Sequence, residues 1–199
     1  MTLLDTRQGI AATWRALTVR TGVYVDADLA VSRLGPPLRQ EMSEWFPSDR
    51  VEEAVGIYRS LYPDYAITPS VTLPGAKEAL DFVRQVPARA VVITSKLGRL
   101  AELHLAHLGI SVDKVYGDVF HSGKAEILRE IGASLYVGDH VADMQAGVLA
   151  GVPAVGITSG PCSAEELRTA GAAEVFADLR PFPAFLQRMI SVGRAGTDD

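Results

Sequence analysis

The sequence has little cysteine and no long hydrophobic run. Its single cysteine, Cys162, excludes an internal disulfide and a zinc site built from cysteines, and it fits a reducing compartment. No stretch comes near the roughly 20 consecutive apolar residues that a membrane-spanning helix needs. The first residues show no basic segment followed by an apolar one, so no signal peptide is predicted. These absences predict a cytoplasmic protein without a membrane partner.

Positive charge is scarce as well. The 199 residues carry 19 Lys and Arg against 24 Asp and Glu, which gives a formal net charge of −5. Because nucleic acids and acidic membrane surfaces attract basic proteins, neither is expected as a partner. Hydrophobic residues make up 48% of the chain, enough to bury a sizeable core in one domain, or in one domain with a small insert.

The first part of the chain has a helical pattern. From residue 8 to about residue 86, apolar residues recur at the spacing of a helix face. A helix is expected to begin at Ser48 or Asp49, and a loop rich in Pro and Thr is expected over residues 62–74. Residues 1–6 are too few to make a convincing strand.

From Ala88 onward, β-branched apolar runs alternate with helical patterns at short spacing. Strands are expected at residues 90–94, 114–116, 135–137, 152–157 and 174–176, and helices at 97–108, 124–131, 144–150, 164–170 and 181–190. This alternation predicts an α/β fold with a doubly wound, Rossmann-like parallel sheet, right-handed crossovers and helices on both faces.

The most informative stretch runs from Leu135 to Asp143. An apolar strand ends at Gly138, and the carboxylates Asp139 and Asp143 follow four residues apart where a helix begins. Open α/β sheets bind ligands at the carboxyl ends of their strands, so both carboxylates could face one crevice. There they would suit Mg²⁺ with water and phosphate oxygens. The alternative is an ordinary helix start, with Asp139 as N-cap and Asp143 in an acidic first turn.

Polar residues also follow the apolar run at residues 90–93. Thr94, Ser95 and Lys96 come directly after it. Hydroxyl and amide groups at the end of a strand can hold a phosphoryl oxygen. The same residues could instead act as an ordinary helix N-cap.

Lys124 stands at the start of a predicted helix. A cation there opposes the helix dipole, which favours a nearby anion or carboxylate as its partner; the alternative is a solvated surface lysine. His104 and His107 lie three residues apart on another predicted helix, and we expect them on its solvated face because a metal site would need further ligands.

These segments, in this order, resemble the haloacid dehalogenase-like hydrolases, in particular the phosphoglycolate phosphatase-like branch with a helical cap. Residues 90–96 resemble the second motif of that family, Lys124 the lysine of the third, and residues 138–143 the fourth, Gly-Asp-x-x-x-Asp. Residues 2–6 resemble the end of the first motif, Asp-x-Asp-Gly-Thr-Leu-x-Asp-Ser/Thr. The proline that commonly follows the third-motif lysine is missing.

The resemblance implies an all-helical cap at residues 7–70, inserted after the first motif into a core of residues 1–6 and 71–199. It also implies a Mg²⁺-dependent phosphomonoester hydrolase that acts on a small phosphorylated metabolite. The oligomeric state is open, with a homodimer as one option. The implied roles are catalysis for Thr94 and Lys124, phosphate binding for Thr94, Ser95, Lys96 and Lys124, and metal binding for Asp139 and Asp143.

The first motif departs from the family pattern. Aligned on residues 2–5, the nucleophilic aspartate, the acid/base aspartate and the strand that carries them would fall before Met1. Asp5 aligns with a later acidic residue of the motif and is no substitute. Without an aspartate to attack phosphorus and form an aspartyl-phosphate, we expect little phosphatase turnover from these 199 residues.

Two explanations for this departure are open. A start codon assigned too far downstream would leave the native enzyme longer at its N-terminus, and the preserved later motifs favour this. Alternatively, the chain is a regulatory relative that binds phosphate or Mg²⁺ without catalysis. An in-frame Asp-x-Asp-Gly upstream of the Met1 codon would support the first explanation, and a stop codon the second. In either case, the absence of a central strand predicts two neighbouring strands with unpaired backbone groups.

Overall fold

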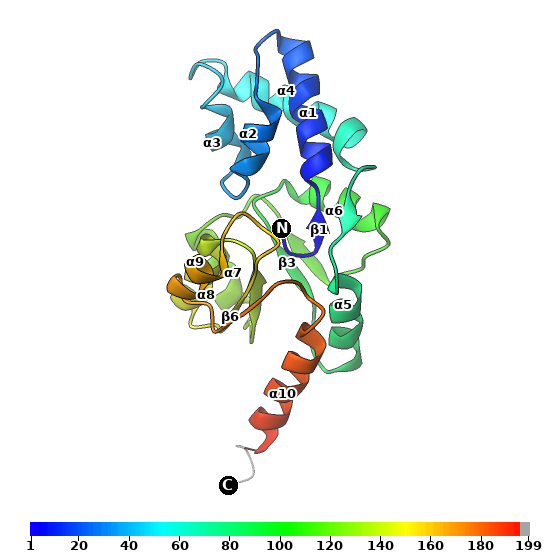
Figure 1. Cartoon of the computed structure of the whole chain (residues 1–199), viewed down its shortest axis with the longest axis vertical. Coiled ribbons are helices and arrows are strands. Elements are labelled where there is room, and N and C mark those ends of the chain that lie inside the picture. Colours follow the sequence, from blue (N-terminus) through cyan, green and yellow to red (C-terminus); the bar gives the residue numbers. More distant parts are fainter. Residues whose placement is uncertain (196–199) are drawn as a thin grey trace.

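A helical layer forms from the first third of the chain, as its apolar spacing predicts. The computed structural model describes residues 1–195, with side chains to residue 191. The layer contains α1 (Arg7–Thr21), α2 (Ala27–Ser32), α3 (Leu38–Met42) and α4 (Val51–Ala66). Their apolar faces bury one core around Trp14, Leu17 and Tyr58. Figure 1 shows this layer at one end of an elongated molecule, with the strands in the middle and α10 (Phe182–Ala195) at the other end.

Helix α4 differs from the prediction at both ends. Its N-cap is Arg50, without a side-chain cap, so the N-cap prediction of Ser48 or Asp49 is wrong by one or two residues. The helix also continues through Pro63 to Ala66, where a loop was expected. Tyr62 and Ala66 are 2% and 0% exposed, and they share the buried face of the helix. Their burial outweighs the backbone hydrogen bond that a proline inside a helix gives up.

The two connections between the helical layer and the rest of the chain form a short ladder. Strand β1 (Leu4–Asp5) pairs antiparallel with β2 (Val71–Thr72). The expectation that residues 1–6 hold no strand is therefore wrong, although two residues are too few to show an alternating pattern.

The predicted α/β fold with parallel strands is confirmed. The strands are β3 (Val91–Ile93), β4 (Lys114–Tyr116), β5 (Tyr136–Gly138), β6 (Ala154–Ile157) and β7 (Glu174–Phe176). The helices of this part are α5 (Ala76–Gln85), α6 (Gly98–His107), α7 (Ser122–Glu130), α8 (Val141–Ala150), α9 (Ala164–Thr169) and α10. Every strand pair among β3 to β7 is parallel, as crossovers through helices require.

The parallel strands fall into two groups. β3 pairs with β4, and β5, β6 and β7 pair in that order. No ladder joins β3 to β5 within the described part of the chain. Residues from both strands instead line one cavity, among them Val92 and Val137. This agrees with the expectation that two strands would lack a neighbour.

No helix within residues 1–195 is both long enough and apolar enough to cross a membrane. The cap limits at residues 7 and 70, the cytoplasmic location, the absence of a nucleic-acid partner and the homodimer stay predictions.

Candidate active site

The loop between β5 and α8 carries Asp139, and the first turn of α8 carries Asp143, the two carboxylates of the Gly-Asp-x-x-x-Asp segment. His140 is the N-cap of α8, and its Nδ1 accepts the Ala142 amide at 3.1 Å. Burial lowers the pKa of His140, which keeps this nitrogen available as an acceptor. Asp143 completes the cap by accepting the His140 amide at 3.2 Å. The alternative in which Asp139 is the N-cap is therefore wrong.

Asp143 is the polar centre of the site. Its Oδ1 accepts from Lys124 Nζ at 2.6 Å and from the Tyr136 hydroxyl at 3.0 Å. Its Oδ2 accepts the amides of Asp139 and His140, both at 3.2 Å. Four donors occupy the four lone-pair positions that a carboxylate offers. In this structure Asp143 is committed to protein groups.

Lys124 lies near the start of α7 and is 8% exposed, while Asp143 is 5% exposed. The alternative of a solvated surface lysine is therefore wrong. The carboxylate of Asp143 offsets the unfavourable helix dipole at this position. Burial, reinforced by the charge of Asp143, raises the pKa of Tyr136 well above its usual range, so this hydroxyl stays protonated and donates. A buried pair of this kind is strongly destabilising to break.

Two glycines allow the carboxylate segments to approach so closely. A Cβ on Gly138 would lie 2.6 Å from Asp143 Oδ2. A Cβ on Gly160 would lie 2.8 Å from the Cβ of Asp139. Neither position has room for a larger residue unless the neighbouring aspartate moves, and at Gly160 its backbone as well.

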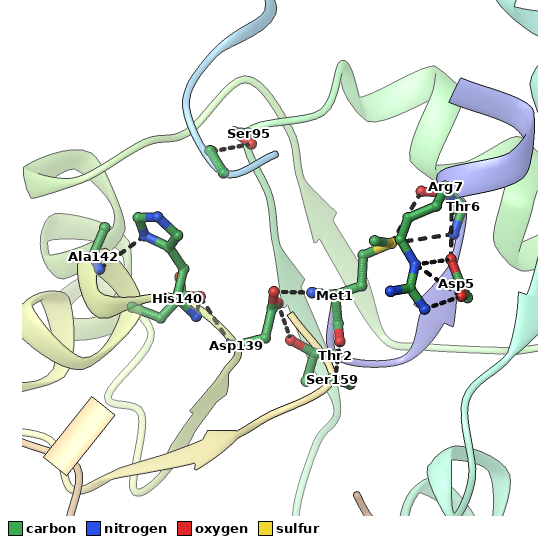
Figure 2. A network of polar contacts seen from close by, with 12 residues as sticks. Met1, Thr2, Asp5, Thr6, Arg7, Ser95, Asp139, His140, Ala142 and Ser159 are labelled. Carbon is green, nitrogen blue, oxygen red and sulfur yellow. Dashed lines mark hydrogen bonds and ion pairs between the residues drawn. The ribbon is translucent and has the colours of Figure 1, made fainter. Parts of the chain in front are cut away.

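Asp139 faces the first residues of the chain (Figure 2). Its Oδ1 accepts from the Thr2 hydroxyl at 3.0 Å, and its Oδ2 pairs with the α-amino group of Met1. The Ser159 hydroxyl donates to the Met1 carbonyl. Burial lowers the pKa of the Met1 α-amino group to about 5, partly offset by the Asp143 carboxylate. No Lys or Arg side chain up to residue 191 pairs with Asp139.

The segment after β3 contacts the helical layer through Ser95 and Lys96, whereas Thr94 makes a local hydrogen bond. Thr94 Oγ1 accepts the Lys96 amide at 3.1 Å, and the Ser95 hydroxyl donates to the Gly35 carbonyl at 3.3 Å. Lys96 Nζ donates to the Tyr62 hydroxyl at 2.5 Å. Neither Thr94 nor Ser95 is the N-cap of α6, so the alternative of an ordinary helix cap is wrong.

All the site residues predicted from the sequence line one cavity of about 460 Å³. They are Thr94, Ser95, Lys96, Lys124, Asp139 and Asp143. Residues of α1, α4 and the segment before α3 also line it, such as Trp14, Tyr58 and Gly35. The structure therefore places all six around one cavity between the helical layer and the strands. Hydrogen bonds join Lys124 and the Asp139 amide to Asp143, whereas Thr94, Ser95 and Lys96 have other partners.

The donor set bears on which cation could bind here. Within the described residues, no group of three or more His, Cys, Asp or Glu side chains could hold a metal ion. Among the cavity carboxylates of the described residues, Asp139 has no Lys or Arg partner. The Met1 α-amino group lies against its Oδ2. Mg²⁺ commonly uses one or two carboxylates and completes its coordination with water and phosphate oxygens. Asp139 fits that ion where the cation takes the place of the Met1 α-amino group at its Oδ2.

The family model of the haloacid dehalogenase-like hydrolases matches residues 1–147. The chain belongs to this family. A tyrosine-protein kinase, PtkA of Mycobacterium tuberculosis, is 30% identical over 110 residues, which are 55% of this chain. That match spans 38% of the kinase, so the chain aligns with well under half the length of that curated relative.

Two further similarities extend over most of this haloacid dehalogenase-like chain. A 5′-nucleotidase of Pseudomonas aeruginosa is 28% identical over 195 residues, covering 89% of this chain and 88% of the relative. A solved haloacid dehalogenase-like hydrolase from Streptococcus pneumoniae superposes with a TM-score of 0.80 at 21% identity, covering 93% of each chain. The latter confirms the Rossmann-like fold with a helical cap.

Sequence reasoning missed a buried polar chain at the edge of the site. His104, expected on a solvated face, is 0% exposed. Its Nε2 lies 3.0 Å from the Tyr62 hydroxyl and its Nδ1 lies 3.0 Å from Ser70 Oγ. Burial, assisted by the charge of Lys96, lowers the pKa of His104 to about 3. A signal was present, because His104 follows Leu100 by four residues on the apolar face of α6.

Proposed function

We propose that this haloacid dehalogenase-like chain carries the phosphate- and metal-binding part of a Mg²⁺-dependent phosphomonoesterase of the phosphoglycolate phosphatase-like type. Its substrate would be a small phosphorylated metabolite. The observation that carries the proposal is the buried Lys124–Asp143 pair in a cavity that Thr94 and Asp139 also line. The similarity to a 5′-nucleotidase over 89% of the chain supports the same general kind of hydrolase.

Each residue has a role in this proposal. Lys124 and the Thr94 hydroxyl bind phosphoryl oxygens, and the lysine offsets their negative charge as it increases during the reaction. Asp139 holds Mg²⁺, which would supply further positive charge to the phosphoryl group when bound.

Asp143 acts as a positioning residue, because its four lone-pair positions already serve protein donors. It orients the Lys124 ammonium and fixes the loop that presents Asp139. The resemblance implies that Asp143 contacts the metal directly. In this proposal Asp143 acts instead through Lys124 and through the loop that presents Asp139.

The proposal also includes little turnover from the 199 residues alone. The carboxylates that line the cavity are Glu41, Asp139 and Asp143. Glu41 accepts from Arg33 at 2.6 Å and from Trp45 Nε1 at 2.9 Å, so it is committed elsewhere. No further carboxylate of the described residues lines the cavity to attack phosphorus. The same observation favours a second candidate, a relative that binds phosphate and Mg²⁺ without catalysis.

Hydrolysis of p-nitrophenyl phosphate with Mg²⁺ distinguishes these functions. We expect little turnover from the 199 residues, and turnover from a fusion in which an apolar strand ending in Asp-x-Asp-Gly precedes Thr2. The matched control is the same fusion ending in Asn-x-Asn-Gly, which should be inactive. An inactive but folded Asp-x-Asp-Gly fusion would favour the non-catalytic candidate. Robust turnover by the unextended chain that Asp139→Asn abolishes would contradict our view of the nucleophile.

A further inference from the structure

Strand β3 has one edge without a strand partner. Within the described part of the chain it pairs with β4 alone. The Thr94 amide donates to the Tyr116 carbonyl at 2.9 Å, which places the backbone groups of Thr94 on the β4 side. Because successive residues of a strand direct their backbone groups to opposite sides, Val91 and Ile93 direct their N–H and C=O groups away from β4.

Strand β5 has a free edge of the same kind. Among the described residues it pairs with β6 alone. The Tyr136 amide donates to the Pro153 carbonyl at 2.9 Å, so the backbone groups of Val137 point away from β6. Val91, Ile93 and Val137 therefore aim N–H and C=O groups at positions where no described strand lies. Such groups need partners when they are removed from water.

The two free edges lie on opposite sides of one cavity. Gly35 contacts the segments that follow both strands: its carbonyl accepts from the Ser95 hydroxyl at 3.3 Å, and a Cβ on it would lie 2.8 Å from the His140 ring. At the other ends of the strands, Ala90 and Leu135 line the same cavity. Strands β3 and β5 therefore run in the same direction on either side of the cavity.

Helices cover both faces of the space between these strands. On one face, Ile93 and Tyr136 pack in one cluster with residues of α7 and α8. On the other face, Val92 and Val137 belong to clusters that both contain residues of α5. We call this part of the cavity the strand slot. Its walls from β3 and β5 are the apolar residues Val91, Val92, Ile93, Leu135 and Val137.

We propose that the strand slot binds one extended apolar segment of a partner polypeptide, which adds a strand between β3 and β5. An extended backbone presents N–H and C=O groups on both of its sides at the spacing of a strand, and these main-chain bonds supply affinity when a peptide joins a sheet. Because helices cover both faces, the segment is apolar on both of its faces. The inference goes beyond the proposed function, because it concerns the free strand edges and not the polar residues of the cavity.

Fluorescence anisotropy with a labelled peptide, Lys-Val-Ile-Val-Ile-Val-Lys, tests the slot. Its apolar run exceeds the three residues of β3 by one residue at each end, and its lysines keep it dissolved. The control peptide has the same sequence with N-methyl groups on alternate apolar residues, which removes donors and keeps the apolar surface. The chain should bind the control at least about tenfold more weakly, as the loss of two or three hydrogen bonds implies.

A proline substitution tests the edge from the side of the protein. Val91→Pro removes an N–H that has no ladder partner, so the fold should persist, as circular dichroism can verify, while peptide binding weakens at least about tenfold. Val115→Pro is the matched control, because the same alternation directs the N–H of Val115 to the outer edge of β4. It should bind the peptide as the unsubstituted chain does. If Val91→Pro fails to fold, the two peptides on the unsubstituted chain still decide.

Four outcomes would overturn the strand slot. They are no binding of the peptide by the folded chain, equal affinities for the two peptides, binding that survives Val91→Pro, and binding that Val115→Pro removes instead. Self-association of the chain in sedimentation experiments, without peptide binding, would assign the slot to a second copy and would also overturn the proposal. All these results leave the proposed function standing, because hydrolysis of p-nitrophenyl phosphate tests that function separately.

Discussion

Acid should destabilise this fold through His104. The imidazole is fully buried between Tyr62 and Ser70, and burial lowers its pKa from 6.5 to about 3. Below pH 6.5 the unfolded chain takes up a proton at this residue, whereas the folded chain does not until about pH 3. Protonation therefore favours the unfolded state throughout this window. The stability that depends on neutral His104 is complete above pH 6.5 and falls as the pH is lowered.

The size of the effect follows from the two pKa values. Between them, the free energy of unfolding changes by about 1.4 kcal/mol per pH unit for one group. From pH 7 to pH 5, His104 should remove about 2 kcal/mol. This is a measurable part of the roughly 5–15 kcal/mol by which domains are stable.

Urea unfolding at pH 7, 6 and 5, followed by circular dichroism, measures this loss. His104→Gln removes the titrating group, so between pH 7 and pH 5 the native chain should lose about 2 kcal/mol more than the variant. His107→Gln is the matched control, because His107 lies on the exposed side of the same helix; it should follow the native chain. Equal pH dependence in the native chain and His104→Gln would show that the stability does not depend on neutral His104.

Three substitutions test the packing of the site by urea unfolding. Lys124→Met leaves the buried carboxylate of Asp143 without its cation and should lower the free energy of unfolding by about 3–5 kcal/mol. The double substitution Lys124→Met with Asp143→Asn should recover part of that free energy, and no recovery would contradict the pairing. Tyr136→Phe removes one hydrogen bond to that carboxylate and should lower the free energy of unfolding by about 1.5–3 kcal/mol. A loss as large as that of Lys124→Met would be inconsistent with the removal of a single hydrogen bond. Gly138→Ala should destabilise the fold by displacing Asp143. Gly56→Ala should instead stabilise α4 by about 0.5–1 kcal/mol, because the added Cβ meets open space. Similar effects at both positions would rule out the steric argument.

The α/β class could be predicted because local sequence patterns in the later part of the chain agree with the strands and helices that form there. Buried parallel strands are short β-branched runs, and a helix follows each at short spacing, so the topology has few alternatives. The polar residues of the site were visible for the same reason. Thr94 and Asp139 directly follow strands, and strand ends in such sheets meet at one edge.

Other features depend on tertiary contacts that no local pattern contains. Helix α4 passes Pro63 because Tyr62 and Ala66 are buried on one face. His104 is buried because its polar partners, Tyr62 and Ser70, come from segments more than thirty residues earlier in the chain. The four donors to Asp143 also come from three separate parts of the chain. The Gly-Asp-x-x-x-Asp spacing therefore could not predict that this carboxylate accepts four hydrogen bonds from protein groups.

The proposed function makes Asp139 the protein ligand of a divalent cation that binds beside a phosphoryl group in this cavity. Calorimetric titration of Mg²⁺ into the chain in the presence of inorganic phosphate tests it most directly. We expect Asp139→Asn to weaken Mg²⁺ binding at least about tenfold. Asp64→Asn, which changes an exposed carboxylate on α4, should leave it unchanged. Equal Mg²⁺ affinities in the native chain and Asp139→Asn would show that Asp139 does not bind the cation.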